Sequence, residues 1–121
     1  MTKQEQLEKL IDDLRQNVPD ITGVMVASTD GLSIASDFPD DEGARIAAVG
    51  AAASGLGARI AQNATLGEVT ETMVKGEEGL LLLYKVGSEG VLAVRAPANG
   101  NLGLVRLEAS DTCKAVREIL G

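Results

Sequence analysis

The sequence has no histidine and no tryptophan, and its aromatic side chains are limited to Phe38 and Tyr84. Without histidine, the most frequent general base and metal ligand of enzymes is missing. The scarcity of aromatic rings weakens the case for base stacking or for a sugar-binding platform. These absences predict a protein that is not an enzyme, with no catalytic residue, no cofactor and no metal ion.

Cysteine and long apolar runs are equally scarce. Cys113 is the single cysteine, which excludes an internal disulfide and favours a reducing compartment. It falls within a predicted helix, beside an apolar stripe, so we interpret it as a core residue and not as a nucleophile. The first ten residues contain no apolar signal core, and no run reaches the length of a membrane span. We therefore expect a cytoplasmic protein.

Positive charge is also in short supply, because eleven basic residues face eighteen acidic ones, for a net charge of −7. Such a chain repels phosphate backbones and anionic lipids, which argues against nucleic acid and direct membrane binding. Asp37 and the acids at 40–42 lack the spacing of a calcium loop and suit a helix start. No phosphate-binding loop occurs, since Gly55-Leu56-Gly57 lies inside a predicted helix. Arg95, near a loop, is the one candidate for an arginine finger, although solvated arginines are the simpler interpretation.

Periodicity and turn residues predict one domain over residues 1–121. Thr2 and Glu5 resemble a capping box, and Pro19 ends the first helix. Strands are expected at 21–28, 32–35, 66–74, 80–86 and 91–95, with helices at about 2–18, 43–62 and 101–120. The order is therefore α-β-β-α-β-β-β-α, an α+β fold. Because 80–86 is apolar on both faces, it suits a strand covered on both sides.

The helix at 43–61 is the most informative segment, since thirteen of its nineteen residues are Gly, Ala or Ser. Interior glycines cost about 1 kcal/mol each relative to alanine, so a helix that keeps them gains close backbone approach. One stripe is large and apolar (Ile46, Val49, Ala53, Leu56, Ile60), and beside it runs a stripe of small residues (Ala47, Gly50, Ser54, Gly57, Ala61). Two such faces need two partners, and we expect the second to be another copy of the chain. The alternative is that the small stripe packs on the chain's own sheet.

Four segments together carry a family resemblance: GVMVASTDGLSIAS, the Gly/Ala-rich helix, KGEEGLLLLYKV and VRAPANGNLGLVRLE. With the element order, they resemble the roadblock family of dynein light chains and of bacterial or archaeal GTPase regulators, over about residues 7–120. The resemblance implies a three-layer α/β/α arrangement around a five-stranded antiparallel sheet, the roadblock/profilin-like fold. It also implies dimers that join through the third strand and the second helix. The expected interface is then the small-residue stripe with Val69, Glu71 and Met73.

Family members act without catalysis of their own, as dimeric platforms that bind and modulate small Ras-like GTPases or that scaffold signalling and motor complexes. The resemblance therefore implies a homodimer that docks a GTPase, and a purely structural scaffold is the alternative. The chain ends one residue after Leu120, without the extra C-terminal segment of the gliding-motility members. This difference concerns GTPase activation more than GTPase binding. On the remaining flank of the second helix, the expected partner-binding residues are Arg45, Ala48, Ala52, Arg59 and Gln62.

Overall fold

The computed structural model describes all residues, 1–121. It confirms the predicted order of three helices and five strands, with these bounds: α1 Lys3–Asn17, β1 Gly23–Ser28, β2 Ser33–Ser36, α2 Asp40–Asn63, β3 Thr72–Lys75, β4 Leu80–Val86, β5 Gly90–Ala96 and α3 Leu102–Leu120. The capping box is present, because the Thr2 side chain accepts from the Glu5 amide and the Glu5 side chain accepts from the Thr2 amide. None of the helices has the length and apolar character needed to cross a membrane.

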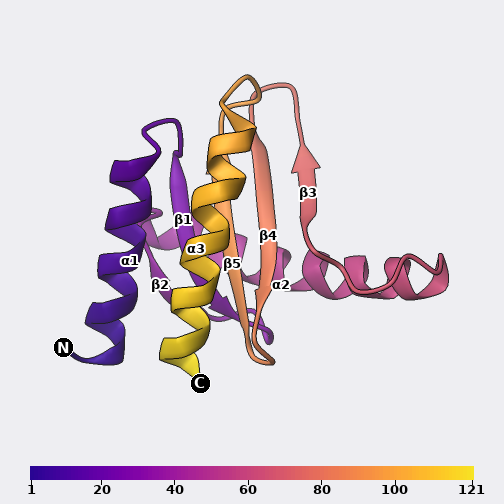
Figure 1. Ribbon diagram of the computed structural model, residues 1–121, viewed down its shortest axis with the longest axis horizontal. Coiled ribbons are helices and arrows are strands. Elements are labelled where there is room, and N and C mark those ends of the chain that lie inside the picture. Colours follow the sequence, from indigo (N-terminus) through magenta and orange to yellow (C-terminus); the bar gives the residue numbers. More distant parts are fainter.

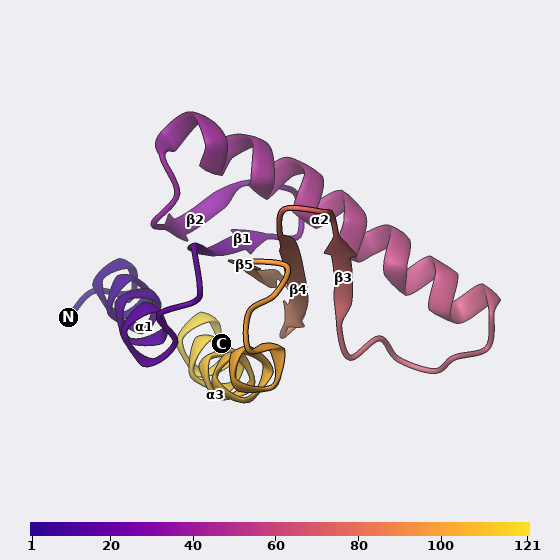
Figure 2. The same cartoon turned by 90° about the horizontal axis from the view of Figure 1, so that it is seen from above.

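The strands form one antiparallel sheet in the order β2-β1-β5-β4-β3, so β2 and β3 are its edges. Helices α1 and α3 cover one face and α2 crosses the other, which gives the expected three layers (Figure 1). Seen from above, α2 continues past β3, and its last turns project beyond the sheet (Figure 2). The fold class predicted from the sequence is therefore confirmed.

Two cores lie on the two faces of the sheet. The larger core joins α1 and α3 to side chains of one strand face, such as Leu82 and Leu92. The smaller core lies under α2 and contains Leu83, Phe38 and Ala47. Because successive strand residues point to opposite faces, Leu82 and Leu83 fall into different cores. The prediction that 80–86 is covered on both sides is confirmed.

The small-residue stripe of α2 packs on the chain's own sheet, which is the alternative interpretation of the sequence. Ala47 and Ala61 are almost fully buried. A Cβ at Gly50 would lie 3.3 Å from Leu83 Cδ2, and one at Gly57 would lie 2.8 Å from Thr72 Oγ1. The expectation that this stripe faces a second copy is therefore wrong. The glycines allow close approach, but the surface they approach is the chain's own strands.

The third strand is shorter than its alternating pattern predicts. Residues 66–71 were expected to lie within it, but β3 begins at Thr72 and pairs with β4 only from Leu83 to Leu80. Val69 and Glu71 precede the strand. Strand pairing on the outer side of β4 therefore stops at Leu83, and 64–71 forms an irregular connection from the projecting end of α2.

The glycines of α2 can be tested by alanine substitution. Gly55→Ala should raise the free energy of unfolding by about 1 kcal/mol, because alanine is the better helix former and nothing lies within 4 Å of the added Cβ. Gly57→Ala makes the same propensity gain, but its Cβ meets Thr72 Oγ1 at 2.8 Å, so it should not stabilise. Urea unfolding of both variants measures the difference. Equal stabilisation by the two would contradict the close packing described here.

Candidate functional site

The large apolar stripe of α2 is the main exposed feature of the molecule. Val49, Leu56 and Ile60 are 61%, 60% and 55% exposed, respectively. Ile46 and Ala53, on the same stripe, are half-buried against the smaller core. Positions 49, 53, 56 and 60 follow the four-three-four spacing of a helix–helix seam. The stripe therefore has the pattern of a packing surface that its own chain leaves uncovered.

This surface extends onto the sheet at β3. Val74 is 58% exposed and pairs with Leu81, which packs on the same core as Ile46 and Ala53. Since directly paired residues share a face of the sheet, Val74 lies on the α2 side. No strand pairs with the outer side of β3. An apolar helix flank and an open sheet edge thus lie together, and we call them the α2/β3 surface.

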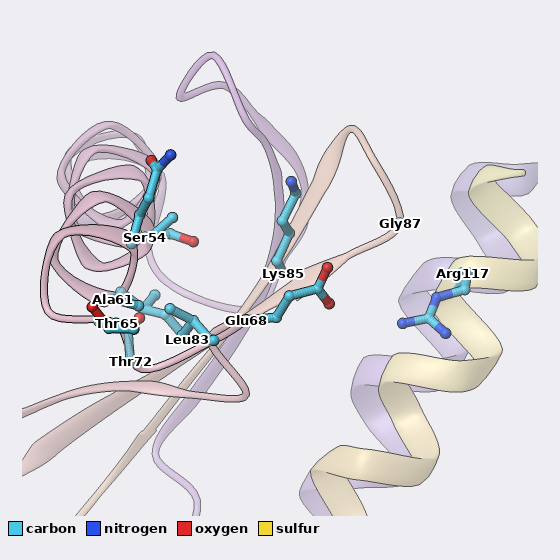
Figure 3. A pocket seen from close by; sticks show the side chains of 13 residues that line it. Ser54, Ala61, Thr65, Glu68, Thr72, Leu83, Lys85, Gly87 and Arg117 are labelled. Atoms are coloured by element: carbon cyan, nitrogen blue, oxygen red, sulfur yellow. The ribbon is translucent and has the colours of Figure 1, made fainter.

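A groove of about 810 Å³ lies beneath the projecting end of α2. Ser54 and Ala61 form its helix wall, Glu68 lies on the 64–71 connection, and Lys85 extends from β4 beyond the point where β3 pairing ends (Figure 3). Arg117 reaches it from α3 on the other face of the sheet. Neither Lys85 nor Arg117 forms an ion pair. The groove is open and mixed in polarity, and Thr72 at the start of β3 lines it.

Glu71 is held within the chain and does not face outward from a strand. Arg106 of α3 donates to both carboxylate oxygens, at 2.9 and 2.8 Å, and the Tyr84 hydroxyl donates to Oε1 at 2.9 Å. The hydrogen bonds from Arg106 hold the pKa of Glu71 below its usual value, whereas burial raises the pKa of Tyr84. The charge of Glu71 is thus paired within the chain, and its place in an interface stays a prediction.

The two other interface residues expected around the third strand remain accessible. Val69, on the 64–71 connection, is 37% exposed. Met73 is partly exposed, but it pairs with Leu82 and therefore lies on the α1/α3 face, away from α2. Only Val74, which was not among the expected residues, joins β3 to the apolar stripe.

The expected partner-binding flank is open. Arg45, Ala48, Ala52, Arg59 and Gln62 are all exposed on α2. Arg45 and Arg59 form no ion pair. Their side of the helix points away from the sheet, next to the apolar stripe, so a partner seated on one could extend over the other. Their role in binding stays a prediction.

Other reactive side chains are engaged in the fold. Arg95, the arginine-finger candidate, donates to Glu42 at 2.7 Å, and its guanidinium lies 4.7 Å from the centre of the Phe38 ring. Cys113 packs against the larger core, and burial raises the pKa of its thiol to about 11. At neutral pH it is therefore protonated and a poor nucleophile.

Comparison with known proteins places the chain among described families. The family model of the Roadblock/LC7 domain matches residues 7–96. The chain belongs to the Roadblock/LC7 family. Among its relatives is the uncharacterized protein MJ0310 of Methanocaldococcus jannaschii, 40% identical over 100 residues, which span 79% of this chain and 87% of the relative. The sequence resemblance to the roadblock family is thereby confirmed.

Solved structures agree with the roadblock assignment. The Roadblock/LC7 domain from Streptomyces avermitilis superposes with a TM-score of 0.88 at 27% identity, covering 93% of this chain and 96% of that one. Myxococcus xanthus MglB gives 0.85 at 21% identity, with 97% and 89% covered. Profilin II of Acanthamoeba castellanii gives 0.60 at 14% identity, with 93% and 97% covered. The last two share the fold.

The carboxylate of Glu71 gives a pH-dependent prediction. Glu71→Gln should lower the free energy of unfolding at pH 7 by about 1 kcal/mol, the scale of a partly exposed ion pair. A carboxylate whose pKa is lower in the folded than in the unfolded state stabilises the fold at pH values above its unfolded-state pKa. That contribution disappears as the pH falls through the folded-state pKa. The gap between parent and variant should therefore begin to narrow as the pH falls below about 4, near the pKa of an unperturbed glutamate. Urea unfolding at pH 7 and pH 3 measures it, with Glu68→Gln as control. A gap as large at pH 3 as at pH 7 would contradict the paired carboxylate.

Proposed function

We propose that the protein is a non-catalytic, homodimeric roadblock module of the cytoplasm that docks a small Ras-like GTPase. The observation that carries the proposal is the α2/β3 surface: Val49, Leu56, Ile60 and Val74 are each more than half exposed. Exposed apolar residues that form one continuous surface mark an interaction site. Family membership supports the GTPase, because the roadblock resemblance implies platforms for such partners.

In the proposed dimer, the apolar stripes of two α2 helices pack against each other around a two-fold axis. The same patch then meets itself, as an isologous interface requires. The open β3 edges lie beside this seam and can pair with each other. The end of α2 that projects beyond the sheet in Figure 2 would then lie over the partner's sheet.

The GTPase would sit on the exposed flank of the paired helices. Ala48 and Ala52 provide a flat central part, and Arg45 and Arg59 provide positive charge toward the ends. Small side chains leave room for a protruding loop of the partner. A GTPase that crosses the two-fold axis would exclude a second one, so two roadblock chains would bind one GTPase.

The dimer is tested by charge insertion into the seam. Leu56→Glu and Ile60→Glu should each yield a folded monomer, because a carboxylate buried between two apolar stripes is costly. Analytical ultracentrifugation measures the mass and circular dichroism checks the fold. Leu107→Glu is the matched control, since Leu107 is 63% exposed on α3, on the opposite face. A dimer that survives both α2 substitutions would eliminate this seam.

The GTPase site is tested on the intact dimer. Ala48→Glu and Ala52→Glu should weaken binding at least about tenfold, which corresponds to about 1.4 kcal/mol, because a larger charged side chain fills the flat surface. Calorimetry is performed with a small Ras-like GTPase of the same organism, loaded with GDP or with a non-hydrolysable GTP analogue. Ser110→Glu on α3 is the control. A regulator distinguishes the two nucleotide states, whereas equal affinity for both would favour the structural scaffold.

A further inference from the structure

The opposite edge of the sheet, β2, is also unpaired. The amide of Asp37 donates to Val24 O and the carbonyl of Leu32 accepts from the Ser28 amide, so both residues turn their backbone toward β1. Neighbouring residues of an antiparallel strand turn their backbone groups to opposite sides, so Ser33, next to Leu32, and Ser36, next to Asp37, both turn their N–H and C=O outward. They share a side although they are three positions apart, because a β-bulge at Ile34 interrupts the alternation: Val26 pairs with Ala35, whereas Ala27 pairs with Ser33. No other strand of the chain pairs with this outer side of β2. The edge therefore offers two donors and two acceptors to an added strand.

This edge lies at the bottom of a groove. Figure 2 shows β2 at the margin of the sheet, with α2 on one side and α1 on the other. The groove has a volume of about 350 Å³, and its walls include Gln4 and Glu8 of α1 and Asp40 at the start of α2. Leu32, 67% exposed, lies at one end of the strand. An extended chain could thus contact two helices as well as the edge backbone.

The groove is negatively charged without compensation. Glu8 and Asp40 are its ionisable lining residues, and no lysine or arginine lines it. Neither carboxylate belongs to an ion pair, although Glu8 accepts a hydrogen bond from the Gln4 side chain at 3.2 Å. An extended segment with basic side chains would meet both carboxylates while its backbone pairs with Ser33 and Ser36.

We propose that β2 binds an extended, lysine- or arginine-rich segment of a partner protein as a sixth strand of the sheet. Such strand addition takes affinity from main-chain hydrogen bonds and specificity from the side chains that flank the edge. A second copy of β2 is a poor occupant, because antiparallel pairing of two copies would bring four like carboxylates to one groove. This site is independent of the α2/β3 surface and does not rest on the proposed GTPase.

The experiment uses a fluorescent octapeptide that alternates lysine and valine, and a matched peptide that alternates glutamate and valine. The lysine peptide should bind the full-length protein more tightly, and amide NMR signals of residues 32–36 should shift. The double variant Glu8→Gln/Asp40→Asn should weaken binding about threefold to tenfold, the scale of two exposed ion pairs. Ser33→Pro should reduce it further, because proline removes an outward N–H while leaving the β1 pairing intact.

The control variant Asp111→Asn/Glu118→Gln removes the same charge from exposed positions of α3 and should bind like the parent. Equal binding of the two peptides, equal loss in both double variants, or binding unchanged by Ser33→Pro would each overturn the proposal. So would self-association through this edge, seen as a sedimenting complex that Ser33→Pro dissociates. Thermal unfolding of each variant confirms that it is folded. These outcomes do not depend on whether the protein binds a GTPase.

Discussion

The close approach of α2 to the sheet is the constraint on which the surface of the molecule depends. Residues at 43, 47, 50, 54, 57 and 61 are Gly, Ala or Ser, and a Cβ at Gly50 or Gly57 would lie only 3.3 or 2.8 Å from a side chain of the sheet. With the small residues turned to the strands, the large apolar residues of the same helix fall on its flank, where the sheet cannot cover them. The exposed stripe is thus a geometric consequence of tight packing on the other side of the helix.

The start of α2 is anchored more firmly than its end. Arg95 of β5 donates to Glu42 and lies over Phe38, and a Cβ at Gly23 would fall only 2.4 Å from that ring. Phe38 therefore lies directly on the β1 backbone, which fixes where α2 begins. Its far end extends past β3 without a strand beneath it (Figure 2). The apolar residues at 56 and 60 are consequently displayed on the part of the helix that the chain supports least.

The sequence predicted the element order and the fold, because turn glycines, capping residues and apolar periodicity are local signals. It also separated the two stripes of α2, but it misassigned which one faces the sheet. Helical periodicity shows which residues share a face, but it does not show which face turns toward the sheet. Large apolar residues usually form the face that packs on the core. The predicted length of β3 was wrong for a different reason. Glu71 has an alternating pattern around it, yet it is drawn to Arg106, 35 positions away, by an ion pair that no local pattern reveals.

The two open edges of the sheet have different chemistry, and this difference limits how copies can assemble. A sheet with two self-complementary edges would polymerise, and proteins place charge on edges to prevent it. Here β3 adjoins exposed Leu56, Ile60 and Val74, whereas β2 is flanked by the unpaired carboxylates of Glu8 and Asp40. Burial of apolar area favours pairing of two β3 edges, whereas repulsion between carboxylates opposes pairing of two β2 edges. Self-pairing confined to one edge would close after two copies, and it would leave β2 free for the proposed partner of opposite charge.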